Sequence, residues 1–370
     1  MSTTTASRTA LRGLIDTLTE VDERWCGPEW NLQSAQDVVD SHRALMHILE
    51  AALIGFFEQN ATRPDLRRIT TSSRKLTGDN PDAIYFDAPL ADGLEYVVHG
   101  NLHGASYFSL TLEEGTQEGG MASNTAGVLN NTDMDIDSNG NFTLYLGGEK
   151  RASNWLPLTP NTSRLTTRHY FEHATPAALD PECEPRMRIE CLTPTPVPAP
   201  PDDASVAAGI QRVTNVIRSR TLEMPPMANR EQPVFVNLTP NEFPPPVPPG
   251  DFGLAAFDAH YSMAPYFIDK DEALVITGRW PTCCFGNVCL WNRFQQTLDY
   301  RNRPVSLNRS QTKLEEDGSF RIILAHENPG LPNWIDTEGK LFGLVFWRFF
   351  IATGEVETPL ARVVKLADLT

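Results

Sequence analysis

The feature that most constrains the fold is an internal repeat, in which the segment 94–171 recurs as the segment 272–350. The first copy contains the blocks LEYVVHGNLHGASYFSLTL, DSNGNFTLYLGGEKRASNWLPL and RLTTRHYF. The second contains EALVITGRWPTCCFGNVCL, EEDGSFRIILAHENPGLPNWID and LVFWRFF. Residues of one type fall at matching positions: Gly100 and Gly278, Gly140 and Gly318, Phe142 and Phe320, Leu146 and Leu324, Asn154 and Asn333, Trp155 and Trp334, and Arg168 and Arg348. A repeat of this length predicts two copies of one structural unit.

Each copy has the pattern of an all-β unit. Short runs of β-branched and aromatic residues alternate with turns rich in Gly, Asn, Asp and Pro. In the first copy this pattern predicts strands at 83–86, 95–99, 105–112, 141–146 and 164–170. Because each strand must bury one face, we expect a mainly β fold with two tandem, related, antiparallel jelly-roll or β-sandwich halves.

Helical and proline-rich segments flank the two copies. Residues 1–62 show apolar residues at helical spacing, and Ser34 with Asp37 forms a helix-start signal. The first β half is then expected at 63–191 and the second at 251–370. Between them, 192–250 is predicted to be a proline-rich linker that contains one helix between the halves.

Composition limits the classes of partner. The chain has 370 residues and a net charge of −16, which disfavours nucleic acid and anionic membrane surfaces as partners. Its first residues lack the apolar core of a secretory signal, so a cytoplasmic protein is expected. None of the six cysteines forms a C-x-x-C pair, so reduced, packed thiols are expected and no structural zinc.

The paired blocks NGNFTLYL…NWLPL…TRHYF and DGSFRIILAH…PNWID…FWRFF carry a family resemblance. They resemble the bacterial proteins that contain domain of unknown function 1214, over roughly 79–171 and 252–366. The resemblance implies tandem jelly rolls similar to viral capsid proteins, and a homo-oligomer, with a trimer as one form. It implies no activity, because the family has no catalytic motif to carry over.

Residues shared by both copies are expected to serve the fold, since folding is the simplest demand that both copies make. We interpret Trp155 and Trp334 as large apolar plugs, and Asn154 and Asn333 as side chains that satisfy loop backbone groups.

The matched arginines Arg168 and Arg348 lie on predicted strands and each requires a partner. Glu149 and Glu327 are the expected carboxylates. The alternative is that the arginines clamp an anionic ligand.

Two pairs of histidines have a spacing that could bind a metal ion. His99 and His103, and likewise His169 and His173, are four residues apart, so each pair would share a strand face. Half-buried, hydrogen-bonded histidines are the expected alternative, and no metal ligands and no cofactor are predicted.

Function is expected where the copies differ, and the polar loop 325–338 is the most divergent block. It brings His326, Glu327 and Asp336 together as candidate catalytic groups. The candidate ligand-binding residues in and near it are Asn333, Trp334, Trp347 and Arg348.

Three functional hypotheses remain. The first is an enzyme or binding protein for a small, largely apolar metabolite held in or between the jelly rolls. The second is a carbohydrate-binding or carbohydrate-modifying module, in which Trp155 and Trp334 stack on sugar rings. The third is a non-catalytic oligomeric assembly protein.

Overall fold

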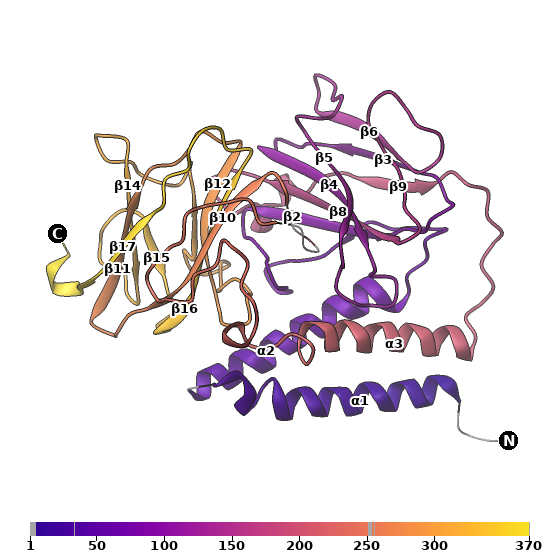
Figure 1. Ribbon diagram of the computed structural model, residues 1–370, viewed down its shortest axis with the longest axis horizontal. Coiled ribbons are helices and arrows are strands. Elements are labelled where there is room, and N and C mark those ends of the chain that lie inside the picture. The colour runs from indigo at the N-terminus through magenta and orange to yellow at the C-terminus, as the bar shows by residue number, and fades with distance from the viewer. Residues whose placement is uncertain (1–4, 33, 251–253, 255, 370) are drawn as a thin grey trace.

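The computed structural model describes residues 5–32, 34–250, 254 and 256–369 (Figure 1). Two β-sandwiches lie side by side, the N-terminal one in violet and magenta and the C-terminal one in orange and yellow. Three long helices form a layer that runs along one side of both sandwiches. The mainly β fold with two halves, an N-terminal helical segment and an inter-half helix is thus confirmed.

The first half contains two sheets. One has the strand order β1-β2-β8-β4-β5 and the other β7-β6-β3-β9. The strands are β1 (Arg67–Arg68), β2 (Ala83–Pro89), β3 (Tyr96–Asn101), β4 (Tyr107–Glu114), β5 (Thr125–Asn130), β6 (Asn141–Leu146), β7 (Trp155–Leu156), β8 (Thr162–Tyr170) and β9 (Arg188–Cys191). Pairing is antiparallel except between β6 and β7, which run parallel.

The second half repeats this arrangement, except that β1 has no counterpart among its described strands. Its sheets have the orders β10-β16-β12-β13 and β15-β14-β11-β17, so β2 corresponds to β10, β8 to β16 and β4 to β12. The strands are β10 (Ala259–Phe267), β11 (Glu272–Gly278), β12 (Phe285–Trp291), β13 (Ser306–Asn308), β14 (Phe320–Ala325), β15 (Trp334–Asp336), β16 (Phe342–Phe350) and β17 (Leu360–Lys365). The parallel pair also recurs, between β14 and β15.

The structure explains why both halves have a glycine at equivalent positions, Gly100 and Gly278. Gly100 on β3 pairs with Phe142 on β6, and Gly278 on β11 pairs with Phe320 on β14. A Cβ at Gly100 would lie 2.4 Å from the Phe142 ring, and one at Gly278 would lie 2.7 Å from the Phe320 ring. Glycine is therefore required in each half so that the phenylalanine ring can cross the neighbouring strand.

The structure also explains the match between Asn154 and Asn333. Asn154 has a φ of 48° and donates its amide to the Asp135 and Thr143 carbonyls, while Asn333 has a φ of 56° and donates to those of Lys313 and Arg321. Asparagine tolerates this left-handed conformation better than most residues. The prediction that these side chains satisfy loop backbone groups is confirmed.

The helix layer consists of α1 (Ala6–Arg24), α2 (Ala35–Ala52) and α3 (Asp203–Arg220). Ser34 and Asp37 form the expected capping box at the start of α2. The π-helical turn η2 (Leu53–Phe57) continues α2. The other short helices are η1 (Pro28–Trp30), η3 (Ala177–Leu179), η4 (Pro181–Cys183), η5 (Met227–Asn229) and η6 (Leu366–Asp368).

The apolar stripe of α2 is only partly covered. Leu45 and Ile48 are buried against α1 and α3, whereas Val39 and Met46 are more than half exposed. In the part of the chain that is described, no helix is long and apolar enough to cross a bilayer.

The two halves meet through the matched sheets that contain β2-β8-β4 and β10-β16-β12. Aromatic side chains fill most of this contact: Tyr107 stacks on Phe350 at 4.2 Å between ring centroids, and Tyr170 packs on Phe285 at 4.8 Å. The chain between α3 and β10 then follows the edge of β10, with backbone bridges at Val236 and Val247. This proline-rich segment protects an edge that would otherwise be open to pairing.

Candidate functional site

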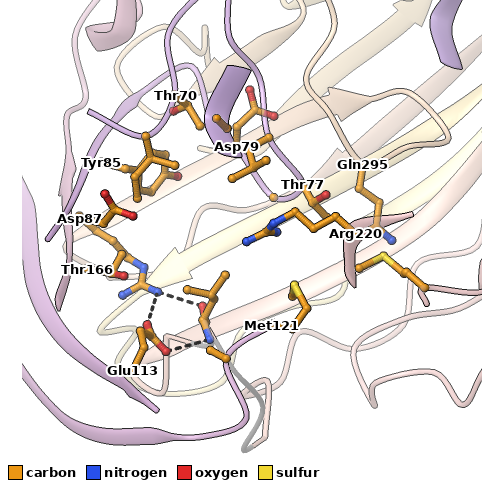
Figure 2. A pocket seen from close by; sticks show the side chains of 18 of the residues that line it. Thr70, Thr77, Asp79, Tyr85, Asp87, Glu113, Met121, Thr166, Arg220 and Gln295 are labelled. Carbon is orange, nitrogen blue, oxygen red and sulfur yellow. Dashed lines mark hydrogen bonds and ion pairs between the residues drawn. The ribbon is translucent and has the colours of Figure 1, made fainter. Parts of the chain in front are cut away.

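A cavity of about 420 Å³, hereafter the central cavity, lies where the two matched sheets meet the helix layer (Figure 2). Its walls come from β2, the end of β4 and β8 of the first half, from β10, β12 and β16 of the second half, and from α2, η2 and α3. A volume in this range is typical of sites for small molecules.

The repeat shows that the two β walls of the central cavity differ in chemistry. Strand register makes five cavity-lining positions of the first half equivalent to five of the second half, and two of these pairs are identical, Tyr85 with Tyr261 and Arg168 with Arg348. The three pairs that differ are Asp87 and Met263, Glu113 and Trp291, and Thr166 and Phe346. At these three positions the first half supplies polar side chains and the second half supplies apolar ones.

The lining is also rich in positive charge. It contains eight arginines and four carboxylates, an excess of four positive charges when all are ionised, in a chain whose net charge is −16. Concentrated positive charge inside an acidic protein favours an anion in the cavity.

Arg220, the last residue of α3, has a buried guanidinium nitrogen without a partner among the described residues. Its side chain extends toward the middle of the cavity (Figure 2), and Nη1 is buried without a hydrogen-bond partner among the described residues. Burial lowers the pKa of Arg220 to about 10, so the guanidinium stays protonated at neutral pH. The carboxylate acting on it, Asp87, is already engaged by Arg164 at 2.6 Å.

Glu113 is hydrogen-bonded through one carboxylate oxygen only: its Oε2 accepts from the Leu254 backbone N–H at 3.3 Å (Figure 2). Its side chain is fully buried, and Oε1 has no hydrogen-bond partner in the described residues. The nearest cation, Arg168, approaches to 3.8 Å, which is an ion-pair distance but too long for a hydrogen bond. Burial raises the pKa of the Glu113 carboxyl.

The π-helical turn η2 holds the polar wall in place. The backbone carbonyl of Gly55 accepts a hydrogen bond from Arg164 at 3.2 Å, and the Phe56 ring lies 4.0 Å from the Arg164 guanidinium. Turns of this type are rare and occur often at functional sites.

Flexible apolar side chains line the cavity near the helix layer. They are Met121, Met224 and Met227, with Ile54 from η2. On the opposite side, Phe346 stacks on Trp291 with ring centroids 4.5 Å apart. Methionines adapt to ligands of irregular shape, so this lining suits an apolar ligand body.

The loop proposed from the sequence as a catalytic site does not line the central cavity. His326 binds the Thr337 hydroxyl at 2.6 Å, and Asp336 accepts a hydrogen bond from Arg303 at 2.7 Å. Glu327 is exposed. These three residues lie at the outer sheet of the second half, and their contacts are those of an ordered loop.

The structure places only one of the four candidate ligand-binding residues, Arg348, in the central cavity. Arg348 lines the central cavity, but its neighbour Trp347 is fully buried in the core of the second sandwich. Asn333 caps the loop, and Trp334 is half-buried with its Nε1 donating to the Ala325 carbonyl. Adjacent residues on a strand face opposite sides, which separates Trp347 from Arg348.

The prediction that Glu149 and Glu327 pair with Arg168 and Arg348 was wrong. Glu149 and Glu327 are exposed, whereas Arg168 donates to Thr111 at 2.5 Å and Arg348 donates to the Gly78 carbonyl at 2.7 Å. The strands place both arginines on the face between the halves, and the two glutamates lie in surface loops.

The histidine pairs do not form metal sites of the expected kind. His169 is fully buried, and neither of its ring nitrogens has a hydrogen-bond partner in the described chain, while His173 is exposed and contacts Cys183 at 3.3 Å. His103 has a φ of 52° in the turn after β3, so it does not share a strand face with His99. All six cysteines are free thiols.

Two solved structures resemble this protein over most of its length. An uncharacterized protein from Burkholderia cenocepacia has a crystal structure that matches with a TM-score of 0.82 and 26% identity, covering 98% of this chain and 100% of that one. The VPA0106 protein from Vibrio parahaemolyticus matches with a TM-score of 0.50 and 16% identity, covering 88% and 98% of the two chains, and shows similarity of fold alone. No curated protein matches.

A family model matches this chain twice, over residues 86–173 and 284–353. One match falls in each β half and includes the strands β8 and β16 that carry Arg168 and Arg348. Both halves of the chain are thus similar to the family described as a protein of unknown function, DUF1214.

Proposed function

We propose that the protein binds a small carboxylate with a largely apolar body in the central cavity. The observation that carries the proposal is the unpaired, buried guanidinium of Arg220. Buried charges in proteins are normally paired, because an isolated one loses its hydration without compensation. An anionic ligand group would supply the partner that the described residues do not provide.

The unequal walls of the cavity support an amphipathic ligand. Arg220, Glu113 and Thr166 offer polar contacts, and Met263, Trp291 and Phe346 offer apolar surface across from them. A carboxylate joined to an aliphatic or aromatic body would satisfy both sides at once.

This proposal specifies the first of the three hypotheses, and the observations favour it over the others. The carbohydrate hypothesis requires accessible indole faces, but Trp155 and Trp334 are half-buried and each donates its Nε1 proton to a backbone carbonyl. Absence of a concave pocket with two or more titratable groups would favour the assembly hypothesis, whereas the central cavity is a pocket lined by several such groups.

The proposal is tested with saturated carboxylates from hexanoate to hexadecanoate and with the primary alcohols of the same lengths, by isothermal titration calorimetry. A hydrogen bond to a charged group is worth about 1.5–3 kcal/mol, so the best carboxylate should bind at least about tenfold more tightly than its alcohol. Native mass spectrometry of freshly purified protein should detect a co-purified anion of the same class.

Arg220→Gln should remove the preference for the carboxylate. The matched control is Arg218→Gln on the same helix, because Arg218 is paired with Glu20 and Glu223 outside the cavity. Equal affinity for carboxylate and alcohol, or the same loss in both variants, would contradict the proposal.

A further inference from the structure

A second cluster of reactive side chains lies in the segment between β8 and β9. His173 follows the end of β8, and Asp180 and Cys183 belong to the turn around η4. One ligand atom from each residue lies within 4.8 Å of the others, in an S, N and O set. Cys183 is 2% exposed, Asp180 is half-buried and His173 is exposed, so the cluster is open to solvent on one side only.

We propose that His173, Asp180 and Cys183 bind one Zn²⁺ ion, with the fourth coordination position facing solvent. The His173 Nδ1 and Cys183 Sγ atoms are 3.3 Å apart. Two such ligands on one tetrahedral zinc, with Zn–N and Zn–S distances of about 2.0–2.3 Å, would be separated by about 3.6 Å. The His173 and Cys183 ligand atoms are therefore spaced nearly as on a zinc ion, the Asp180 carboxylate lies within 4.8 Å of both, and a mixed S, N and O set suits zinc.

The protein around the cluster already orients its ligands. The Phe171 ring packs edge-on against His173 at 5.5 Å, and Asn308 of the second half donates to the His173 carbonyl at 2.9 Å. One oxygen of Asp180 accepts a hydrogen bond from the Glu182 backbone N–H. Ligands held by such neighbouring contacts bind a metal with a smaller entropic cost.

Charge around the cluster also favours a cation. The acids Asp180 and Glu182 lie beside Cys183 in the turn around η4. A zinc ion would offset their negative charge, and the Cys183 thiol would bind it as a thiolate and release its proton to solvent.

A similar trio elsewhere provides the matched control. Asp22, Cys26 and His42 also bring S, N and O atoms within 4.8 Å. There the imidazole contacts the carboxylate, at 2.8 Å between His42 and Asp22, rather than the sulfur. Substitution of Cys26 should therefore leave zinc binding unchanged.

The experiment uses the reduced full-length protein, stripped with a chelator, supplied with Zn²⁺ and desalted before metal analysis. The wild type and Cys26→Ser should each retain one zinc per chain. His173→Ala, at an exposed position, and Cys183→Ala should each lose it. The affinity measured by chelator competition should fall by more than the roughly 10- to 100-fold typical for loss of an outer-shell contact.

Replacement of zinc by Co²⁺ identifies the sulfur ligand directly. The wild type and Cys26→Ser should show a thiolate-to-cobalt charge-transfer band that is missing in Cys183→Ala. Zinc retention unchanged in both His173→Ala and Cys183→Ala, or a charge-transfer band that disappears with Cys26→Ser, would overturn the assignment. These readouts do not depend on ligand binding in the central cavity.

Discussion

Arg168 and Arg348 hold the two halves together by reciprocal hydrogen bonds. Arg168 of the first half donates to the carbonyl of Leu254, which precedes the first strand of the second half, at 3.0 Å. Arg348 of the second half donates to the carbonyl of Gly78, which precedes β2, at 2.7 Å. Each arginine also lies opposite a tyrosine of its own sheet, Tyr85 or Tyr261.

Residues that match between the two halves and residues that differ between them have different roles. The matched arginines serve the same contact in both halves, as expected of residues that the fold requires. The chemistry of the central cavity instead depends on positions where the halves differ, such as Glu113 against Trp291. Arg220 lies in the inter-half helix and has no counterpart in the repeat.

The first prediction concerns the matched glycines. Gly278→Ala should lower the free energy of unfolding by about 1–3 kcal/mol, because the new Cβ would lie 2.7 Å from the Phe320 ring and force it to move. Urea denaturation followed by circular dichroism measures the change. Gly100→Ala should have an effect of similar size through Phe142.

Gly13→Ala is the control for this prediction. Gly13 lies within α1 and no atom comes within 4 Å of a Cβ placed there, so alanine should raise stability by about 0.5–1 kcal/mol through helix propensity. Equal effects at Gly13 and Gly278 would show that close approach of the phenylalanine is not the reason for glycine.

The fold could be predicted from the sequence because each copy of the repeat carries the same turn residues and the same strand periodicity. The turn before Phe142 and the turn before Phe320 carry the same Gly, and the strand pattern has period two in both halves. Period two also places Trp347 and Arg348 on opposite faces, so the assignment of both to one ligand site was inconsistent with the pattern itself.

The central cavity was not predictable in the same way. Ser109, Thr111 and Glu113 alternate with core residues on β4, a pattern typical of a solvent-facing side, but the second half covers that side. The position of Arg220 depends on how α3 packs beneath the sheets after a proline-rich linker. Sequence periodicity describes one sheet at a time and carries no signal for contacts between two separate sandwiches.

The second prediction concerns His169, which packs on Phe108 with ring centroids 4.6 Å apart. Burial lowers the pKa of His169 from its ordinary value of 6.5 to about 3. Between these values the unfolded chain binds a proton that the folded protein does not. The free energy of unfolding is therefore independent of His169 protonation above about pH 6.5, and it decreases as the pH falls from 6.5 toward 3.

His169→Phe should flatten this dependence and raise the free energy of unfolding at pH 7 by about 1–3 kcal/mol, since it removes unsatisfied buried nitrogens. Urea unfolding at pH 7 and pH 5 provides both values. The control is His42→Gln, an exposed position paired with Asp22. A pH slope in His169→Phe as steep as in the wild type would show that other groups cause it.

The third prediction concerns Glu113 and the proposed carboxylate ligand. The raised pKa of Glu113 means that lowering the pH protonates it and removes a negative charge from the cavity wall. Carboxylate affinity in the wild type should therefore rise as the pH is lowered and Glu113 takes up its proton, at a higher pH than an ordinary glutamate would. In Glu113→Gln it should already be high at pH 8 and change little, because the amide preserves the shape without the charge.

Like charges in a partly dry cavity repel, so removal of the Glu113 charge should raise carboxylate affinity wherever Glu113 is ionised in the wild type. Titration calorimetry over a series of pH values measures the difference. Glu231→Gln is the control, because Glu231 lines the same cavity from an exposed position where solvent screens its charge. If affinity in Glu113→Gln falls with that of the wild type as the pH rises, the dependence originates outside Glu113. A loss of affinity in Glu113→Gln would instead identify the ionised carboxylate as a direct ligand contact.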